Sequence, residues 1–406
     1  MKFAHLADCH IGGWKDEKLA AIGLKTFELA LNECISRNID FILISGDLFN
    51  TALPNIDYIK EVARLLKLVK DSEIKIYTIA GSHDYSVSGK TMLDVLENAG
   101  LIQNAARFDN DALKFIIDPK SNAKITGLYG KKGGLERYDY EALNRKNLEN
   151  EQGFKIFMFH SGIKEFMPAG LEDIDSLPIN ALPANFNYYA GGHIHYVFQK
   201  KTGNSLLMFP GALFPNNFKE LEEFNHGGFY IVDDSLKYEF IKINAKDVLS
   251  IAIDANNKTP DEVTSEVLKY EPQSKDKIVT IRIEGILKEG KPSDINFRQI
   301  MESFSDAYCV VRNTSKLAAK DFKIMEVKEE NIEDIEKAII TENNENILLF
   351  GDYTEKSKFV NDLIETFSLE KQEGEKSYTF EEKLVGNITK LFSKELENDN
   401  KQNKIA

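Results

Sequence analysis

The chain is poor in the residues that build disulfide frameworks and membrane spans. Its 406 residues include three cysteines and one tryptophan. Cys9, Cys34 and Cys309 lie far apart, which excludes a disulfide framework and a CxxC metal site. No apolar run approaches the length of a membrane span, and the opening MKFAHLAD lacks the apolar stretch of a signal peptide. We therefore expect a soluble protein of a reducing, cytoplasmic compartment that does not enter a membrane.

Positive charge is also scarce. The formal net charge is −14, which argues against general affinity for nucleic acids. The segment from Glu329 to Ala406 holds 19 acidic and 10 basic residues, so most of the excess lies in the tail. Nucleic acid therefore stays open as a partner of the first 328 residues.

The first 240 residues repeat one pattern, in which a short apolar run is followed by polar residues with glycine and then by a helical stretch. The runs are FAHLA (3–7), FILIS (41–45), IYTIA (76–80), KIFMF (155–159) and YYAGG (188–192). Such runs, alternating with helices such as 57–70, predict buried strands of an α/β sandwich over 1–242. Strand-like segments near 206–209 and 228–232 indicate a second sheet.

The pattern changes near residue 245. Alternating strands at VLSIAIDA, KIVTIRIEGIL and AYCVVRN, with helical stretches between them, predict a smaller α/β domain over 245–328. Residues 329–396 are acidic and are expected to form a helical tail, and 397–406 should be disordered. The tail has two amphipathic stretches, whose apolar faces include Phe359, Leu363 and Phe367, then Leu384, Ile388 and Leu391.

Polar side chains follow each of the five apolar runs in the first region. They are Asp8, His10, Asp47, Ser82, His83, Asp84, His160, His193 and His195. The carboxyl ends of strands are where ligands gather in α/β sheets, so we expect these residues to meet. Each position alone fits a cap or a turn, but repetition after five strands favours a common site.

Imidazoles and carboxylates in one cleft favour manganese, iron or zinc. Six ligands (Asp8, His10, Asp47, His160, His193 and His195) are too many for one tetrahedral ion but suit two ions that share a carboxylate. Two ions about 4 Å apart can clamp a phosphoester during in-line displacement. His83 is then free to protonate the leaving oxygen or to stabilise charge, and Asp84 is expected to orient its imidazole.

The order D-x-H, GDLF, G-x-HD, H, GHIH resembles the calcineurin-type metallophosphoesterase superfamily. Within it, HLADCHIG, SGDLFN, FHSGI, LPANFNYYAGGHIH and FPGAL resemble the SbcD or meiotic-recombination-eleven family of DNA double-strand-break repair nucleases, in its archaeal form. The resemblance implies a four-layered αββα sandwich with a smaller α/β capping domain that binds DNA and a helical C-terminal tail. It also implies a manganese-dependent 3′-to-5′ exonuclease on duplex ends and endonuclease on single strands and hairpins.

The resemblance also assigns the metal ligands. It gives Asp8, His10 and His195 to one manganese ion and His160 and His193 to the other, with Asp47 as the bridge and His83 as the transition-state histidine. Two departures bear on activity. Ser82 stands where the family has an asparagine ligand, so it is either a weak ligand or a turn residue. Asn50 replaces a histidine that positions the terminal nucleotide.

Two rival functions remain open at this point. The first is a DNA-end tether whose chemistry Ser82 and Asn50 have weakened. The second is a phosphodiesterase for small substrates with the same metal centre, although a cap and a tail would be superfluous for it.

Partners are predicted from three further features. The segment 127–146 combines Lys131, Lys132 and Arg137 with tyrosines, which fits either DNA contact or a solvated loop. The chain lacks GxxxxGK[ST], so ATP hydrolysis has to come from the family's partner, an SbcC-type coiled-coil ABC ATPase bound by the tail. Helices at 57–70 and 90–99 match the family's homodimer contact, and a nucleoid-associated protein is expected.

Overall fold

In the computed structural model the described residues are 1–86, 91–110, 112–167, 176–320 and, within 358–392, residues 358–359, 362–363, 366–367, 369, 380 and 383–392. The chain forms two compact units, Met1–Asp321 and Phe322–Ala406, which we describe separately.

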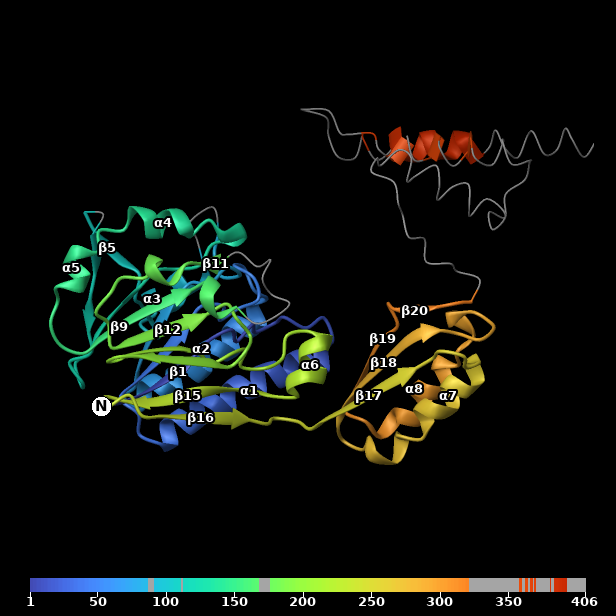
Figure 1. Ribbon diagram of the computed structural model, residues 1–406, viewed down its shortest axis with the longest axis horizontal. Helices are drawn as coiled ribbons and strands as arrows, with labels where there is room; N and C mark the ends of the chain where they lie inside the picture. The colour runs from blue at the N-terminus through green and yellow to red at the C-terminus, as the bar shows by residue number, and fades with distance from the viewer. Residues whose placement is uncertain are drawn as a thin grey trace, which may run out of the picture. The chain divides into compact units, whose positions relative to one another are not determined.

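Two six-stranded sheets form the centre of the first unit (Figure 1). The first has the order β16 (Tyr238–Ile243), β15 (Gly227–Asp233), β1 (Lys2–Leu6), β2 (Phe41–Ser45), β3 (Lys75–Ile79) and β4 (Gln103–Asn104). The second has the order β13 (Phe198–Thr202), β14 (Ser205–Phe209), β12 (Tyr188–Gly192), β9 (Lys155–His160), β8 (Lys124–Gly127) and β7 (Ile116–Ile117). Strands β1 to β4 are parallel, as are β8, β9, β12 and β14.

Alternate side chains of these strands enter different cores, as the two-residue period of a strand requires. Phe3 and Phe41 pack between the sheets, whereas Ile42 and Ile44 pack under the helices α1 (Glu17–Ser36), α2 (Ile56–Asp71) and α3 (Met92–Asn98). On the outer face of the second sheet, Phe157 packs in a cluster with residues of α4 (Arg137–Ala142) and α5 (Lys146–Glu149). The predicted αββα sandwich is confirmed.

One detail of the sequence prediction is wrong. The segment near 228–232 is strand β15, which lies antiparallel to β1 in the first sheet and does not belong to the second. The five apolar runs also divide, three into the first sheet and two into the second. Strands buried on both faces have similar sequences in either sheet, so their composition does not tell which sheet they join.

After β16 the chain enters a separate small sheet, formed by β17 (Val248–Asp254), β18 (Ile278–Ile286), β19 (Cys309–Asn313) and β20 (Leu317–Ala318). Helices α7 (Pro260–Leu268) and α8 (Phe297–Ser303) share a core with it (Figure 1). Helix α7 begins with a Thr259–Glu262 capping box and a proline at its first turn. We call residues 245–320 the small-sheet module.

Shorter elements complete the first unit. They are β5 (Arg107–Asp109), β6 (Ala112–Lys114), β10 (Gly162–Ile163), β11 (Ser176–Leu177), α6 (Phe218–Phe224) and the 3₁₀ turns Lys132–Gly134, Lys164–Phe166, Ile179–Ala181, Glu271–Gln273, Pro292–Asp294 and Phe304–Asp306. Within the described parts of the chain, no helix is both long and apolar enough to cross a bilayer.

The second unit is described only in part. Helical backbone is present at 358–359, 362–363, 366–367 and 383–392, where the two amphipathic stretches were predicted. Phe359 is buried, and its ring meets that of Phe392 edge to face with 5.2 Å between centroids. Phe367 is 63% exposed. Residues 329–357 and the predicted disordered end, 397–406, lie outside the described residues.

Candidate metal centre

The predicted ligand side chains lie together, on the loops that follow strands of both sheets. Three groups have ligand atoms within 4.8 Å of one another, namely Asp8–His10–His195, His10–Asp47–His83 and Asp8–Asp47–His160. These residues follow β1, β2, β3 and β12, and His160 is the last residue of β9, so five strand ends from two sheets contribute. Each of the three groups offers the nitrogen and oxygen ligands that transition metals bind.

The loop backbone is turned into an unusual conformation at this site. Asp8, His10, Asp47 and His193 have φ angles of 50°, 42°, 51° and 88°, in the left-handed region that non-glycine residues seldom adopt. Such residues cluster where surrounding structure holds a functional side chain in place. Here the His10 amide donates to the Asp47 carbonyl at 2.9 Å, so neighbouring loops hold each other.

Two imidazoles in the first group face each other. The Nε2 atoms of His10 and His195 are 3.1 Å apart. Nδ1 of His10 lies 3.1 Å from Asn50 Oδ1, and Nδ1 of His195 lies 2.8 Å from Glu220 Oε1. With both Nδ1 atoms directed at acceptors, the two Nε2 atoms remain on the side of the cluster. Two imidazole nitrogens this close together, beside Asp8, fit the ligand set of a metal ion.

His160 supplies a second indication. Its Nδ1–H donates to the Ser45 carbonyl at 2.8 Å, whereas its buried Nε2 has no hydrogen-bond partner among the described residues. That Nε2 lies 3.2 Å from Asp47 Oδ2. Burial lowers the pKa of His160, but the charges of Asp47 and Asp8 outweigh it and raise that pKa to about 10. The carboxylates thus require a positive charge at this point, which a divalent ion can supply.

His193 completes the set from the second sheet. Its amide donates to both carboxylate oxygens of Asp8, at 3.0 and 3.1 Å, and its ring meets His160 edge to face. Burial lowers the pKa of His193 to about 3, and burial likewise lowers that of His10 to about 3. Both rings are therefore neutral, the form that binds a metal. Ser82 is at the edge of the site, with Oγ 3.5 Å from Asp47 Oδ2.

His83 lies beside the ligand cluster, but the residue that accepts its hydrogen bond is Asn50 and not Asp84. Its Nδ1 donates to the backbone carbonyl of Asn50 at 2.9 Å, and its amide donates to Asp47 Oδ1 at 2.8 Å. The prediction that Asp84 orients this imidazole is wrong. The Asp84 carboxylate accepts from the amides of Leu48, Phe49 and Gly81, at 3.0 to 3.1 Å, so it joins the loops after β2 and β3. Burial and then the Asp47 charge raise the pKa of Asp84 to about 7.

Glu220 was not identified as a site residue from the sequence, and Asn50 was identified only as the replacement of a histidine that the family has there. Asn50 orients two histidines, His10 through its side chain and His83 through its carbonyl. Glu220 orients His195. The only sequence signal for Glu220 is its place three residues after Asn217, the N-cap of α6, which predicts a helix start but not a contact with a ligand.

Glycines make the close approach of these loops possible. A Cβ on Gly192 would lie 1.9 Å from the Ser45 carbonyl oxygen and 2.8 Å from His160 Nδ1. A Cβ on Gly81 would lie 2.2 Å from Asp47 Oδ1. Neither position can take a side chain without displacing a ligand.

A cavity of about 360 Å³ opens at the centre, lined by Ser82, His83, Lys131, Lys132, Gly133, Gly134, Glu136, His160 and His193. Two of the predicted DNA-contacting residues are therefore beside the predicted ligands. Lys131 pairs with Asp139 at 2.8 Å, which reduces its free charge, whereas Lys132 is exposed. Arg137 does not line this cavity and stacks on Tyr138 with 4.8 Å to the ring centroid.

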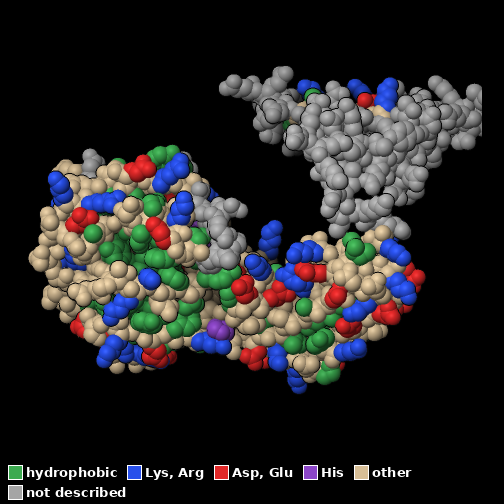
Figure 2. All heavy atoms as spheres, in the orientation of Figure 1, with side chains coloured by type: hydrophobic (Ala, Val, Ile, Leu, Met, Phe, Trp, Pro, Cys, Tyr) green, Lys and Arg blue, Asp and Glu red, His purple; other side chains and the backbone are tan. Residues whose placement is uncertain are grey.

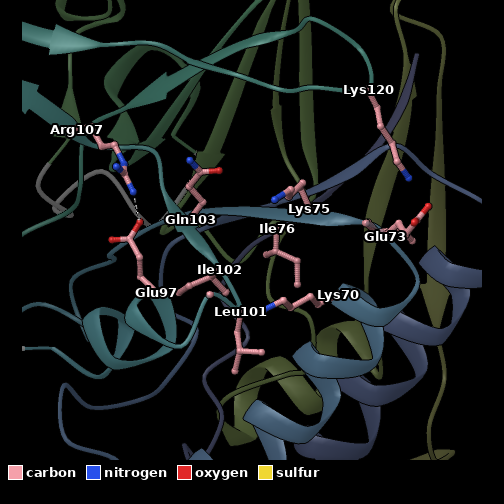
Figure 3. Close-up of a pocket in the computed structure, with 12 residues that line it drawn as sticks. Lys70, Glu73, Lys75, Ile76, Glu97, Leu101, Ile102, Gln103, Arg107 and Lys120 are labelled. Carbon is pink, nitrogen blue, oxygen red and sulfur yellow. Dashed lines mark hydrogen bonds and ion pairs between the residues drawn. The ribbon is translucent and has the colours of Figure 1, made fainter.

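A larger hollow of about 680 Å³ lies elsewhere, beside the amino end of β3 (Figure 3). Lys70, Lys75 and Lys120 line it, together with the Glu97–Arg107 ion pair, whose atoms are 2.6 Å apart. The hollow contains none of the predicted ligands. The carboxyl ends of the strands remain the candidate site.

Comparison with known proteins agrees with this geometry. A family model described as calcineurin-like phosphoesterase matches residues 1–197. The chain is similar to proteins named "DNA double-strand break repair protein Mre11". The one from Archaeoglobus fulgidus is 26% identical over 377 residues (85% of this chain, 78% of the relative), and the one from Methanococcus maripaludis is 31% identical over 265 residues (61% and 67%). The one from Sulfolobus acidocaldarius is 24% identical over 391 residues (90% and 94%).

The αββα fold and the histidine–aspartate cluster together define a calcineurin-like phosphoesterase. Within that superfamily, the chain belongs to the Mre11/SbcD family, as the sequence motifs predicted.

Divalent cations should stabilise the folded chain. An ion that binds only the folded state adds about 2.7 kcal/mol at one hundred times its Kd. We expect Mn²⁺ to raise the thermal unfolding midpoint and EDTA to reverse the rise. Asp47→Asn removes the carboxylate shared by two of the groups and should abolish most of the shift, as measured by scanning calorimetry.

The matched control is Asp71→Asn, which changes an exposed carboxylate paired with Lys67 and should keep the full shift. A wild-type midpoint that does not respond to millimolar Mn²⁺ would contradict the assignment.

Proposed function

We propose that the protein is a manganese-dependent DNA nuclease of double-strand-break repair. It hydrolyses phosphodiesters, as a 3′-to-5′ exonuclease on duplex ends and as an endonuclease on single strands and hairpins. The observation that carries the proposal is the convergence of possible metal ligands around Asp47: the Nε2 atoms of His10 and His195 are 3.1 Å apart, and Nε2 of His160 lies 3.2 Å from Asp47 Oδ2. Relatives named for DNA double-strand-break repair support DNA as the substrate.

The donor set supports two ions in the arrangement that the sequence motifs predicted. Asp8, His10 and His195 hold one ion, His160 and His193 hold the other, and Asp47 is shared. Asp47 suits the shared role because burial, which alone would raise its pKa, is outweighed above all by the charge of His160, which helps to bring that pKa far below its usual value. Ser82 is at the second site, where a hydroxyl is a weaker ligand than an amide oxygen.

When bound, a pair of divalent ions supplies charge stabilisation and an activated water for in-line attack on phosphorus. The chain positions the phosphodiester in the cavity beside Lys131 and Lys132. His83 lies at the same cavity, and because its Nδ1 is held by the Asn50 carbonyl, its Nε2 is left to face the substrate. A doubly protonated His83 donates the Nε2 proton to the leaving oxygen.

DNA contact is assigned to local side chains rather than to a broad basic face. In the view of Figure 2, basic and acidic side chains are interspersed over the described residues. Lys132 is exposed at the cavity, and the stacked pair Tyr85–Tyr129, 6.1 Å between centroids, lies beside Lys131. Arg137 contributes at the periphery. The small-sheet module serves as the DNA-binding cap.

Assembly partners follow from exposed apolar side chains. Leu53 and Ile56 are each 76% exposed at the start of α2, and Val95 of α3 is 53% exposed, which supports a homodimer through these helices. In the tail, Phe367 and Val385 are 63% and 60% exposed, which supports docking on the coiled-coil ABC ATPase. Leu363, Leu384, Ile388 and Leu391 are partly buried, and Phe359 is buried against Phe392.

A second candidate function is a DNA-end tether with weakened chemistry. Ser82 favours it, because its Oγ is 3.5 Å from Asp47 Oδ2 and gives the second ion only a short, neutral ligand. The two functions differ in metal content, since a tether needs no more than one tightly held ion.

His83→Ala should abolish cleavage and spare metal binding. Loss of a positioned proton donor lowers rates about 10²- to 10⁴-fold. The measurement is a gel assay on hairpin and duplex DNA in Mn²⁺, beside a calorimetric Mn²⁺ titration. The control is His226→Ala, a histidine outside the three groups. Wild-type cleavage rates would refute the role of His83, and a lost ion would make His83 a ligand, as its proximity to Asp47 and His10 allows.

Ser82→Asn separates nuclease from tether. In a weakened nuclease the added amide oxygen should tighten the second ion and raise the DNA cleavage rate several-fold, whereas Ser36→Asn, on the surface of α1, should change neither. Bound manganese per chain is measured by mass spectrometry after desalting. Two tight ions and rapid cleavage by the wild type would exclude the tether.

Lys132→Ala should weaken DNA binding in a salt-dependent way. Loss of one phosphate contact reduces the slope of log affinity against log salt by about 0.9 for duplex DNA. Fluorescence anisotropy on a duplex end, with the His83→Ala background to prevent cleavage, measures the slope. Lys201→Ala, an exposed lysine of β13, is the control, and equal slopes for both variants would remove Lys132 from the interface.

A further inference from the structure

Helix α6 is only seven residues long, but it contacts both the metal centre and the small-sheet module. Leu221, at its middle, is fully buried in a cluster that joins Leu19 and Phe214 of the sandwich to Ile278 and Cys309 of the module. The neighbouring residues of the helix reach in different directions. Glu220 reaches His195, and Glu222 reaches the module.

The Glu220 carboxylate is held at three points. Its Oε1 accepts from His195 Nδ1 at 2.8 Å and from Asn217 Nδ2, and its Oε2 accepts from the Asn216 amide at 2.8 Å. Its own amide donates to Asn217 Oδ1 at the start of the helix. The carboxylate therefore moves with the start of α6, and the plane of the His195 ring follows it.

The same helix is fixed from the module by one arginine. Arg282, on strand β18, directs Nε at both Glu222 oxygens, at 3.1 and 2.9 Å, and Nη1 at Glu284 Oε1 at 2.9 Å. Its guanidinium also lies over the Phe218 ring, 5.1 Å from the centroid. The side chains of Arg282 and Glu222 are only 21% and 17% exposed, so this contact is sheltered from solvent.

We propose that Glu220 and Arg282 are positioning residues for the ion at Asp8, His10 and His195, and that α6 transmits the position of the small-sheet module to that ion. Glu220 acts directly on the ring of His195. Arg282 acts one step away, because it fixes the helix that carries Glu220. Affinity for this ion therefore depends on a contact made by the module, outside the ligand set.

The expected losses of metal affinity differ because Glu220 contacts the ligand His195 directly, whereas Arg282 acts through helix α6. Carboxylates that orient a metal-bound histidine contribute about 10- to 100-fold in metal affinity. Residues that couple to a site through an intervening element contribute about 2- to 30-fold. The ion held by His160 and His193 shares neither contact, so its affinity should stay unchanged and serve as an internal reference.

The inference rests on the proposed two-ion site, so the experiment first titrates the wild type with Mn²⁺. Binding is measured by calorimetry and by the electron paramagnetic resonance signal of the free Mn²⁺. No binding by the wild type would end the proposed function itself. Given two binding events, Glu220→Ala should weaken one event about 10- to 100-fold. Glu220→Gln keeps an oxygen acceptor for His195 Nδ1 and should restore most of that loss.

Arg282→Ala should weaken the same event about 2- to 30-fold. In the double variant Glu220→Ala/Arg282→Ala the two losses should not add, because Arg282 acts through Glu220. Lys219→Ala, on the exposed side of α6, and Arg298→Ala, which removes an exposed pair with Glu302 of α8, are the controls and should leave both events unchanged.

Thermal unfolding in EDTA shows whether each variant is folded without metal. In Mn²⁺, unchanged affinity at the site of His160 and His193 is a second sign that the variant is folded. Equal weakening of both events by Glu220→Ala, or no rescue by Glu220→Gln, would indicate a structural role and overturn the positioning role. Unchanged affinity in Arg282→Ala, or strictly additive losses, would overturn the transmission through α6.

Discussion

The structure depends on the concentration of acceptor groups at one buried point. Asp8, Asp47 and the Nε2 atoms of three histidines converge where little water is available to solvate them. Burying charge without a counter-charge is costly, so this arrangement is stable only with positive charge among the side chains. The strained loop backbone, the glycines and the buried hydrogen bonds of the surrounding loops all serve to keep these groups together against their mutual repulsion.

Much of this could be predicted from the sequence. Buried strands have continuous apolar runs, and β1, β2, β3, β9 and β12 begin and end within a residue or two of the runs that predicted them. The ligands could be predicted because histidine and aspartate recur immediately after those runs, where turn chemistry alone does not require a histidine. The α/β sandwich and the later α/β domain followed from the pattern of strands and helices, whereas the αββα layers and the family followed from the resemblance of the motifs.

The residues that orient the ligands could not be predicted in the same way. Asn50 and Glu220 are ordinary turn or helix-start residues in sequence, and which histidines they orient is decided by loops from other strands. Asp84 illustrates the difference, because adjacency to His83 in sequence implied a partnership, whereas the fold turns its carboxylate toward three amides. The sequence also did not predict which sheet β15 joins. Its pairing with β1 connects segments far apart in the chain, and local composition carries no information about such pairing.

The ligands come from both sheets, which has a mechanical consequence. Between the sheets, the core consists mainly of apolar side chains, whose contacts have no preferred direction. Coordination bonds do have direction, and Asp8 and His10 belong to one sheet while His193 and His195 belong to the other. A bound ion thus adds directional bonds between the two sheets at one edge of the sandwich, beside the hydrogen bonds from His160 to Ser45 and from His193 to Asp8.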